Sequence, residues 1–480
     1  MAPESRDASP LIRVERLVPG GEGFARHTDG RSIFIPRSFP GDLILPVQTT
    51  AKKSWSRIES FELKQASAQR RTPPCADAEA CGGCDWMPLG ETEQLLAKTE
   101  ILKDALRRVG KFSEDDFPQV TAHESVRLLG YRERVRLQVR GGRLGFFSSR
   151  SHHLVEIERC HVARVEVWEL VVFLRELMAT QRDLFRPIAE IEIRALTNQP
   201  VESAPLQQDS DGAEAEKKFR GARLSLFLFP VRASRATRGK TASGASKAGR
   251  VQQKLDELLA QLENVTYPQF DVGVFGGIQP EQPWQIFNST EARLPVGGFS
   301  QVNPEVNRQL IEFVLQSAPD QGTVLDLYCG AGNFSFPLAE RGLDVLGVEL
   351  PGASIQAAAR WAAKVSSPVS FRAGDALEVA MSLADRGQQF DFVVVDPPRS
   401  GARGLAPALR RLTRQGLVLI GCDPVAFARD LRTVVEQGFS LKRLELFNMF
   451  PQTHHFESVA LLKPDAESAA QDSPSASLDV

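Results

Sequence analysis

The last third of the sequence predicts a doubly wound α/β domain, in which helices cover both faces of a parallel sheet. Helical stretches alternate with four apolar runs typical of buried strands, "TVLDLYC", "DVLGVEL", "FDFVVVD" and "GLVLIGC". A glycine-rich turn follows the first run, and an acidic residue lies at the end of each of the next two. Ligands bind at the carboxyl ends of the strands in this class, so these features place a site at that edge.

We expect three domains and a tail. Residues 1–64 alternate short β-like runs with glycine-rich turns, which is typical of a small β-barrel. Residues 65–300 mix strands and helices, which predicts a central α+β domain. Residues 301–463 form the doubly wound, Rossmann-like domain, and residues 464–480 have the composition of a disordered tail.

Some elements of the central domain can be predicted from local pattern. Apolar residues at helical spacing predict helices over residues 91–110 and 165–180. Residues 203–250 are rich in Ser, Ala, Gly, Lys and Arg, a composition that predicts a flexible basic insertion. Inside that insertion, "ARLSLFLFP" at residues 222–230 predicts a strand.

The overall composition is that of a soluble globular protein, with 42% hydrophobic and 25% charged residues. No run of about 18 apolar residues is present, and the N-terminus "MAPESRDASP" lacks the features of an export signal. We therefore expect a cytoplasmic protein with no membrane partner. The net charge of −2 gives no indication of nucleic-acid binding. The arginine-rich stretch over residues 126–150 either binds phosphates or forms a solvated strand face.

The glycine-rich turn suggests a nucleotide-type cofactor. Gly330 and Gly332 follow the first strand, and Glu349 ends the next, where its carboxylate can accept ribose hydroxyls. Asp326 lies within the first strand, and the pattern lacks the third glycine that helps a helix pack over a pyrophosphate. These two details favour S-adenosylmethionine over a dinucleotide, with a purely structural turn as the remaining alternative.

A second strand end carries the motif "DPPR". Its two prolines stiffen the turn, so Asp396 is held toward the cleft as an acceptor for a base or a cofactor amine. In methyltransferases that act on the adenine amino group, a similar acidic turn is followed by an aromatic residue. Here Arg399 takes that place, which disfavours that chemistry.

A lone thiol, Cys422, follows the last of the four runs and precedes a predicted helix start. Methylation of carbon 5 of a pyrimidine requires a thiolate that adds to carbon 6 and a base that removes the carbon 5 proton. Cys422 fits the nucleophile, and the helix dipole could lower its pKa. His454, His455 and Glu457 all precede the final strand, and each is a candidate base.

Three further cysteines lie close together, Cys75, Cys81 and Cys84, and Cys160 stands alone in "VEIERCHV". Four thiolates can ligate an iron–sulfur cluster or a tetrahedral zinc ion. From spacing alone the cluster is only slightly favoured, because structural zinc more often uses two paired C-x2-C knuckles.

Four motifs in this order and spacing resemble those of the RNA (uracil-5-)methyltransferase family, "LDLYCGAGNF", "VVVDPPRSG", "GCDPVAFARDL" and "MFPQTHHFESVALL". The family includes bacterial enzymes that form 5-methyluridine in 23S ribosomal RNA and in tRNA. A further element, "GGFSQVNPEVN", also matches. The resemblance covers nearly the whole chain, failing mainly in the 203–250 insertion and the tail.

The resemblance implies roles for individual residues. Cys422 would be the nucleophile and Glu457 the base, and Cys329 would be structural. The residues placed around S-adenosylmethionine or the target base would be Gln301, Tyr328, Asn333, Glu349, Asp375 and Asp396. Members with the same cysteine spacing hold a [4Fe-4S] cluster, for which the ligands here would be Cys75, Cys81, Cys84 and Cys160. The N-terminal β segment resembles the small RNA-binding barrel called TRAM.

The resemblance also implies an enzyme acting on structured RNA, with 23S ribosomal RNA as the substrate. We expect the protein to be a monomer. One alternative is methylation of tRNA. Another is an RNA-binding protein with a decayed catalytic site, suggested by Gly421-Cys422-Asp423-Pro424 where the family usually has Ser-Cys-Asn-Pro. The charge of Asp423 is expected to raise the pKa of the neighbouring thiol unless a cation compensates.

Overall fold

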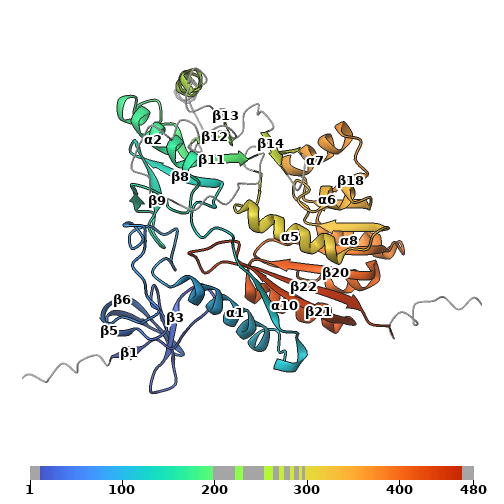
Figure 1. The fold of residues 1–480 in the computed structure, drawn as a ribbon, viewed down its shortest axis with the longest axis horizontal. Coiled ribbons are helices and arrows are strands. Elements are labelled where there is room, and N and C mark those ends of the chain that lie inside the picture. Colours follow the sequence, from blue (N-terminus) through green and yellow to red (C-terminus); the bar gives the residue numbers. More distant parts are fainter. Residues whose placement is uncertain are drawn as a thin grey trace, which may run out of the picture. The chain divides into compact units, whose positions relative to one another are not determined.

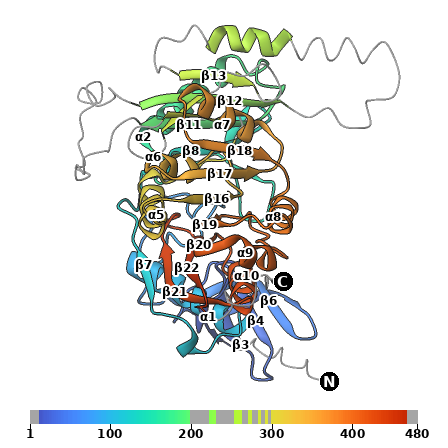
Figure 2. The ribbon, with the colours of Figure 1, turned by 90° about the vertical axis from the view of Figure 1, so that its right-hand side faces the viewer.

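The computed structural model describes residues 11–197, 222–230, 253–262, 270–274, 282–285, 291–294 and 298–466 (Figures 1 and 2). The chain forms two compact units, each discontinuous in sequence. Unit 1 comprises Met1–Glu79, Cys84–Leu128 and Ala380–Val480, and unit 2 comprises Ala80–Gly83 and Leu129–Val379. The four sequence ranges expected for the domains stay a prediction.

A six-stranded sheet forms the N-terminal part of unit 1, in the order β1-β5-β6-β4-β3-β2 (blue in Figure 1). Its strands are β1 (Ile12–Arg13), β2 (Arg16–Leu17), β3 (Gly23–Arg26), β4 (Ser32–Ile35), β5 (Leu43–Ala51) and β6 (Trp55–Gln65). A small core joins them, with Val14, Ile33, Ile35, Ile44 and Ile58 buried together. The predicted short strands are therefore present, and closure into a barrel stays a prediction. The glycine-rich sequence "PGGEGFARHTDGR" at residues 19–31 is typical of a turn, but within it β3 is a strand because it pairs with β2 and β4.

The second sheet region of unit 1 has five strands hydrogen bonded in the order β19-β20-β22-β21-β7. The strands are β7 (Val120–His123), β19 (Phe390–Val395), β20 (Thr413–Gly421), β21 (Phe439–Phe447) and β22 (Glu457–Pro464). The accompanying helices are α1 (Glu91–Arg108), the short η1 (Glu114–Asp116), α9 (Ala406–Leu412) and α10 (Pro424–Glu436), and α8 (Ala376–Asp385) contains the boundary between the units. Helix α1 packs against α10.

This region corrects the prediction of a parallel sheet. Strands β19 and β20 are parallel, but β22 is antiparallel to both β20 and β21. A parallel crossover needs about a dozen residues or more, and the connection from Phe447 to Glu457 is too short to supply one. The fold is therefore a mixed α/β arrangement.

Unit 2 contains three parallel strands in the order β18-β17-β16, seen side by side in Figure 2. These are β16 (Thr323–Leu327), β17 (Asp344–Glu349) and β18 (Val369–Ala373), with helices α5 (Pro304–Ser317), α6 (Ser335–Glu340) and α7 (Ala353–Lys364). Helix α6 connects β16 to β17, and α7 connects β17 to β18. This alternation is the predicted βαβ pattern.

Unit 2 also contains a six-stranded sheet in the order β10-β9-β8-β11-β12-β13. Its strands are β8 (Arg134–Arg140), β9 (Arg143–Phe147), β10 (Leu154–Val155), β11 (Ile188–Thr197), β12 (Ala222–Pro230) and β13 (Phe270–Val274). The unit also contains helix α2 (Val165–Thr180) and a helix over 253–262. Strands β14 (Gln282–Gln285) and β15 (Glu291–Leu294) form a separate hairpin. Apolar residues of β8 and β11 and one face of α2 share a core.

Several local predictions are confirmed. Helix α1 matches the expectation over 91–110, α2 matches 165–180, and β12 coincides with "ARLSLFLFP". The rest of the 203–250 insertion and the tail beyond residue 466 lie outside the described residues. Within the part of the chain that the structure describes, no helix is both long and apolar enough to cross a membrane.

Candidate active site

The thiol of Cys422 lies where β20 ends and α10 begins. Buried apolar residues carry β20 to Gly421, and a Cβ at Gly421 would lie only 3.1 Å from Cβ of Phe427 in the following helix. Asp423 is the N-cap of α10, because its Oδ1 accepts hydrogen bonds from the backbone N–H groups of Val425 (3.0 Å) and Ala426 (2.8 Å). Pro424 occupies the first helical position, where its missing N–H is not needed. The strand exit predicted for this thiol is confirmed.

The register of the sheet places Glu457 opposite Cys422. Strands β20 and β22 are antiparallel, with Gly421 paired to Ser458. Cys422 follows Gly421, and Glu457 precedes Ser458. Because the strands are antiparallel, Cys422 and Glu457 are therefore neighbours across the sheet. Strand β19 runs parallel to β20, with Val395 beside Leu419, so Asp396 follows at the same edge.

Burial and charge disfavour the ionised forms of the two central groups, Cys422 and Glu457. Burial, followed by the charges of Glu457 and Asp396, raises the pKa of Cys422 to about 12, and Arg399 acts in the opposite direction. Burial and the charge of Asp396 also raise the pKa of Glu457 well above its ordinary value, again opposed by Arg399. Glu457 is only 4% exposed. The environment therefore resists a second negative charge beside Asp396.

Two expectations about the thiol are corrected. The helix dipole was expected to lower the pKa of Cys422, whereas burial and two carboxylates raise it. Asp423 was expected to raise it unless a cation compensates, whereas the charges that raise it most are those of Glu457 and Asp396. The carboxylate of Asp423 is bonded to the first turn of α10, so its main role is that of a helix cap.

Replacing Asp423 with Asn is therefore expected to leave the pKa and the reactivity of the Cys422 thiol unchanged. Asn and Asp cap helices about equally well, so the unfolding free energy should change by less than about 0.5 kcal/mol. In both proteins alkylation of Cys422 by iodoacetamide should rise about tenfold per pH unit between about pH 7 and about pH 10, because the thiolate fraction grows in that proportion below the pKa. Cys422→Ala gives the background from the other cysteines. A much faster reaction of the Asn variant at neutral pH would contradict this assignment.

Two histidines precede Glu457. Burial, the neighbouring His454 and Arg399 lower the pKa of His455 to about 3, so its imidazole is neutral. Nδ1 of His454 lies 2.6 Å from Oδ2 of Asp85, a pairing between residues 369 positions apart. No local pattern in the sequence indicates that contact, and the prediction did not include Asp85.

The glycine-rich turn of unit 2 follows β16. Tyr328 has φ of 64°, which is unusual for a residue with a side chain, and Gly330 and Gly332 continue with φ of 59° and 93°. A Cβ at Gly332 would lie 2.6 Å from the ring of Phe336, so glycine is required there. Oε2 of Glu349 accepts a hydrogen bond from the N–H of Gly330 at 3.0 Å. The structure thus brings Gly330 and Glu349 together, and the cofactor site itself stays a prediction.

The other expected cofactor residues of unit 2 differ in their surroundings. Asn333 exchanges two hydrogen bonds with Asn307, of 2.9 and 3.0 Å. Oε1 of Gln301 is buried and has no hydrogen-bond partner among the described residues, so it is an available acceptor. Asp375 is exposed and caps α8, accepting from the backbone N–H groups of Leu377 and Glu378. That capping role accounts for Asp375 without a ligand.

The four expected cluster ligands are divided between the two units. Cys75 and Cys84 belong to unit 1, and Cys81 and Cys160 belong to unit 2, so neither unit holds three of them. Cys81 and Cys160 pack with the hydrophobic core of unit 2. Within the described ranges, no group of three or more His, Cys, Asp or Glu side chains is arranged to hold a metal ion.

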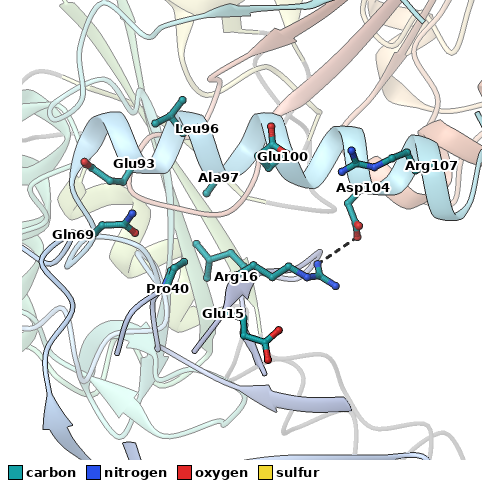
Figure 3. Close-up of a pocket in the computed structure, with 11 residues that line it drawn as sticks. Glu15, Arg16, Pro40, Gln69, Glu93, Leu96, Ala97, Glu100, Asp104 and Arg107 are labelled. Atoms are coloured by element: carbon teal, nitrogen blue, oxygen red, sulfur yellow. Dashed lines mark hydrogen bonds and ion pairs between the residues drawn. The ribbon is translucent and has the colours of Figure 1, made fainter. Parts of the chain in front are cut away.

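Two pockets lie away from these residues. One, of about 230 Å³, is lined by residues of the N-terminal sheet and α1, including Arg16, whose Nη1 lies 3.5 Å from Oδ2 of Asp104 (Figure 3). The other, of about 610 Å³, lies along α2 and includes Trp168 and Phe173. None of the predicted site residues lines either pocket.

Comparisons with known proteins agree with the sequence motifs. Residues 288–370 and 375–465 match the family model described as tRNA (Uracil-5-)-methyltransferase. The chain is 32% identical over 466 residues to a protein of Shewanella halifaxensis named 23S rRNA (uracil(1939)-C(5))-methyltransferase RlmD, covering 94% of this chain and 95% of that one. It is 29% identical to an uncharacterized RNA methyltransferase of Aquifex aeolicus, covering 95% and 99% of the two chains.

A solved structure has a similar fold. It is the Pyrococcus abyssi tRNA (uracil-54, C5)-methyltransferase in complex with S-adenosyl-L-homocysteine, with a TM-score of 0.64, 18% identity, and coverage of 94% of this chain and 100% of that one. At this identity the likeness concerns the fold alone.

Proposed function

Because the chain belongs to the RNA (uracil-5-)methyltransferase family, we propose that it transfers a methyl group from S-adenosylmethionine to carbon 5 of a uridine in 23S ribosomal RNA. The observation that carries this proposal is the placement of Cys422 opposite Glu457 at one sheet edge. Relatives named as 23S rRNA (uracil-C5)-methyltransferases align over nearly the whole chain and support the choice of RNA.

In the proposed reaction the sulfur of Cys422, after losing its proton to solvent, adds to carbon 6 of the uracil ring. The electron pair moves onto the ring, which makes carbon 5 nucleophilic, and carbon 5 takes the methyl group that S-adenosylmethionine supplies. The carboxylate of Glu457 then removes the carbon 5 proton, the carbon–sulfur bond breaks, and the thiolate leaves. A raised pKa makes the Glu457 carboxylate a stronger base than an exposed one.

Asp396 and Arg399 complete the proposed reaction site. Arg399 is the cation whose charge opposes the pKa increases of both Cys422 and Glu457. It would therefore favour the thiolate before attack and the carboxylate before proton removal. Asp396 would accept a hydrogen bond from the target base or from the cofactor.

S-adenosylmethionine is proposed to bind at the glycine-rich turn of unit 2. Glu349 has the position of an acceptor for ribose hydroxyls, and the free Oε1 of Gln301 would accept a hydrogen bond from the cofactor. Tyr328 and Asn333 flank the same turn. Asp375 is the weakest member of the proposed set, because helix capping already explains its conformation.

The proposed RNA contacts include the six-stranded sheet of unit 2. Along β8 the apolar residues face the core and the arginines point away from it, among them Arg134, Arg136 and Arg140. Arg136 also pairs with Glu190 and Glu192, so only part of this charge is available for phosphates. We further propose a TRAM-like RNA-binding role for the N-terminal sheet, a monomeric state and a cytoplasmic location.

A [4Fe-4S] cluster bound by Cys75, Cys81, Cys84 and Cys160 remains a proposal supported by the cysteine spacing. A brown anaerobic preparation with about four irons per chain is expected. Cys160→Ser should lose most of this iron, whereas Cys329→Ser should retain it, because Cys329 is not a proposed ligand. Zinc bound without iron would contradict the cluster assignment.

The choice of RNA can be tested with unmodified transcripts of 23S ribosomal RNA and of tRNA and with methyl-labelled S-adenosylmethionine. We expect labelled 5-methyluridine in the 23S transcript only. Label in tRNA only would favour the alternative substrate. Binding of RNA without label in either transcript would favour an RNA-binding protein with a decayed site.

A further inference from the structure

A set of buried hydrogen bonds holds the segment that leads into Glu457. This segment, residues 448–456, connects β21 to β22 and is called here the base segment. Its partners lie on α1 and on the chain directly after Cys84, all within unit 1. Nothing in the sequence motifs predicts this contact, because about 350 positions separate the partners, as in the bond between Lys98 and Asn448.

Gln452 is the centre of the contact. It is fully buried and has φ of 70°, a backbone conformation that residues with a side chain rarely adopt. Its backbone N–H donates to Oε1 of Gln94 at 2.9 Å, and Nε2 of Gln94 donates back to its Oε1 at 3.0 Å. Arg71 donates a further hydrogen bond to that oxygen at 2.7 Å. These bonds keep Gln452 in its strained conformation.

Trp86 and Asp85 add two connections to the same segment. The backbone N–H of Trp86 donates to the carbonyl of Gln452 at 3.1 Å. Asp85 contacts the ring of His454 at 2.6 Å, between Oδ2 and Nδ1. The base segment is therefore bonded on one side to the residues that follow Cys84.

Lys98 is the most unusual member. It is completely buried, and its ammonium donates to Oδ1 of Asn448 (2.7 Å) and to the carbonyl of Phe450 (3.1 Å). Among the described residues it forms no ion pair. Burial lowers its pKa to about 7, and the charge of Asp85 acts in the opposite direction. Burying a charged group costs free energy, and replacing buried ionic groups with apolar side chains of similar size is often neutral or stabilising. Its presence therefore points to a role other than stability.

We propose that Lys98, Gln94 and Gln452 are positioning residues that fix the base segment and so align the carboxylate of Glu457 with the carbon 5 proton. Neither Lys98 nor Gln94 contacts the reacting groups, and both act through the backbone and side chains of residues 448–452. The inference rests on the proposed role of Glu457 as the base. Its consequence is specific, because misalignment should slow proton removal without affecting attack by Cys422.

The test is the fate of the covalent intermediate in Lys98→Met. The full-length protein is mixed with an unmodified 23S transcript and methyl-labelled S-adenosylmethionine and is then quenched in detergent. Label is measured in the protein–RNA band and in free RNA. We expect adduct breakdown to slow about 10- to 100-fold, because small misplacements cost that much, with the KM for RNA unchanged. Label should therefore accumulate in the protein–RNA band.

Three comparisons make the result decisive. Lys103→Met changes a partly exposed lysine on the same helix and should behave as the unaltered protein. Gln94→Met is the second variant and should show the same accumulation. Adding Lys98→Met to Glu457→Gln should produce no further slowing, because both changes affect one step.

The inference is wrong if the adduct of Lys98→Met breaks down at the normal rate. It is also wrong if adduct and product decrease in equal proportion, because that is the result expected of a purely structural role. Absence of adduct and product in the unaltered protein would overturn the proposed function as well. A third outcome would overturn the positioning role alone. In it the unaltered protein turns over, Glu457→Gln traps the adduct, and Lys98→Met breaks its adduct down at the normal rate.

Discussion

The Cys422→Ala protein is expected to transfer no measurable methyl group to RNA, a loss of at least about 10⁴-fold. Carbon 5 of uracil becomes nucleophilic only when a group has added to carbon 6, and Cys422 is the thiol opposite Glu457 at the sheet edge. The rate is measured as labelled 5-methyluridine formed in a 23S transcript.

Cys422→Ser is the companion variant, because it keeps the size of the side chain and replaces the sulfur with a much weaker nucleophile. It should also be inactive. Thermal unfolding checks that both variants fold, and Cys422 is only partly buried, so the stability change should be small. Methyl transfer by Cys422→Ala at more than a few per cent of the normal rate would remove the thiol from the mechanism.

Replacing Glu457 with Gln is expected to slow turnover about 10²- to 10⁴-fold and to trap the methylated adduct. The amide has nearly the same shape as the carboxyl group, so the buried position at the start of β22 remains filled. It cannot accept the carbon 5 proton, so the carbon–sulfur bond to Cys422 should persist. The measurement is the fraction of protein that migrates with labelled RNA in denaturing gels.

His455 provides the control for this prediction, since it was a candidate base in the sequence. Its pKa is lowered by burial and by neighbouring positive groups, so its imidazole is a weak base. His455→Gln should therefore not trap the adduct. Rapid turnover by Glu457→Gln, together with an adduct trapped by His455→Gln, would move the role of base to the histidine.

The sequence predicted those elements whose signals are local. Helices α1 and α2 follow from apolar residues at helical spacing, and β16, β17, β19 and β20 follow from short apolar runs. Strand β7 was missed, because it becomes a strand through parallel pairing with β21, which lies far along the chain. The antiparallel direction of β22 was missed as well, although the short connection before it was visible in the sequence.

Only part of the candidate site could be predicted, because contacts between distant parts of the chain leave no local signal in the sequence. Motifs identified Cys422, Glu457 and the glycine-rich turn, and the register and hydrogen bonds of the structure place each at a strand end. The cause of the raised thiol pKa was not predicted, because it depends on burial and on two carboxylates, Glu457 and Asp396, brought in by the fold. The bonds from Lys98 and Gln94 to the base segment have no local signal at all.

The most direct test of the central claim is a covalent trap. A 23S transcript containing 5-fluorouridine has no carbon 5 proton for Glu457 to remove, so the reaction should stop after methyl transfer. With S-adenosylmethionine we expect one stable complex whose mass equals protein, RNA and one methyl group, with the RNA joined to Cys422. Absence of such a complex with every RNA tried, or attachment at another residue, would contradict the account.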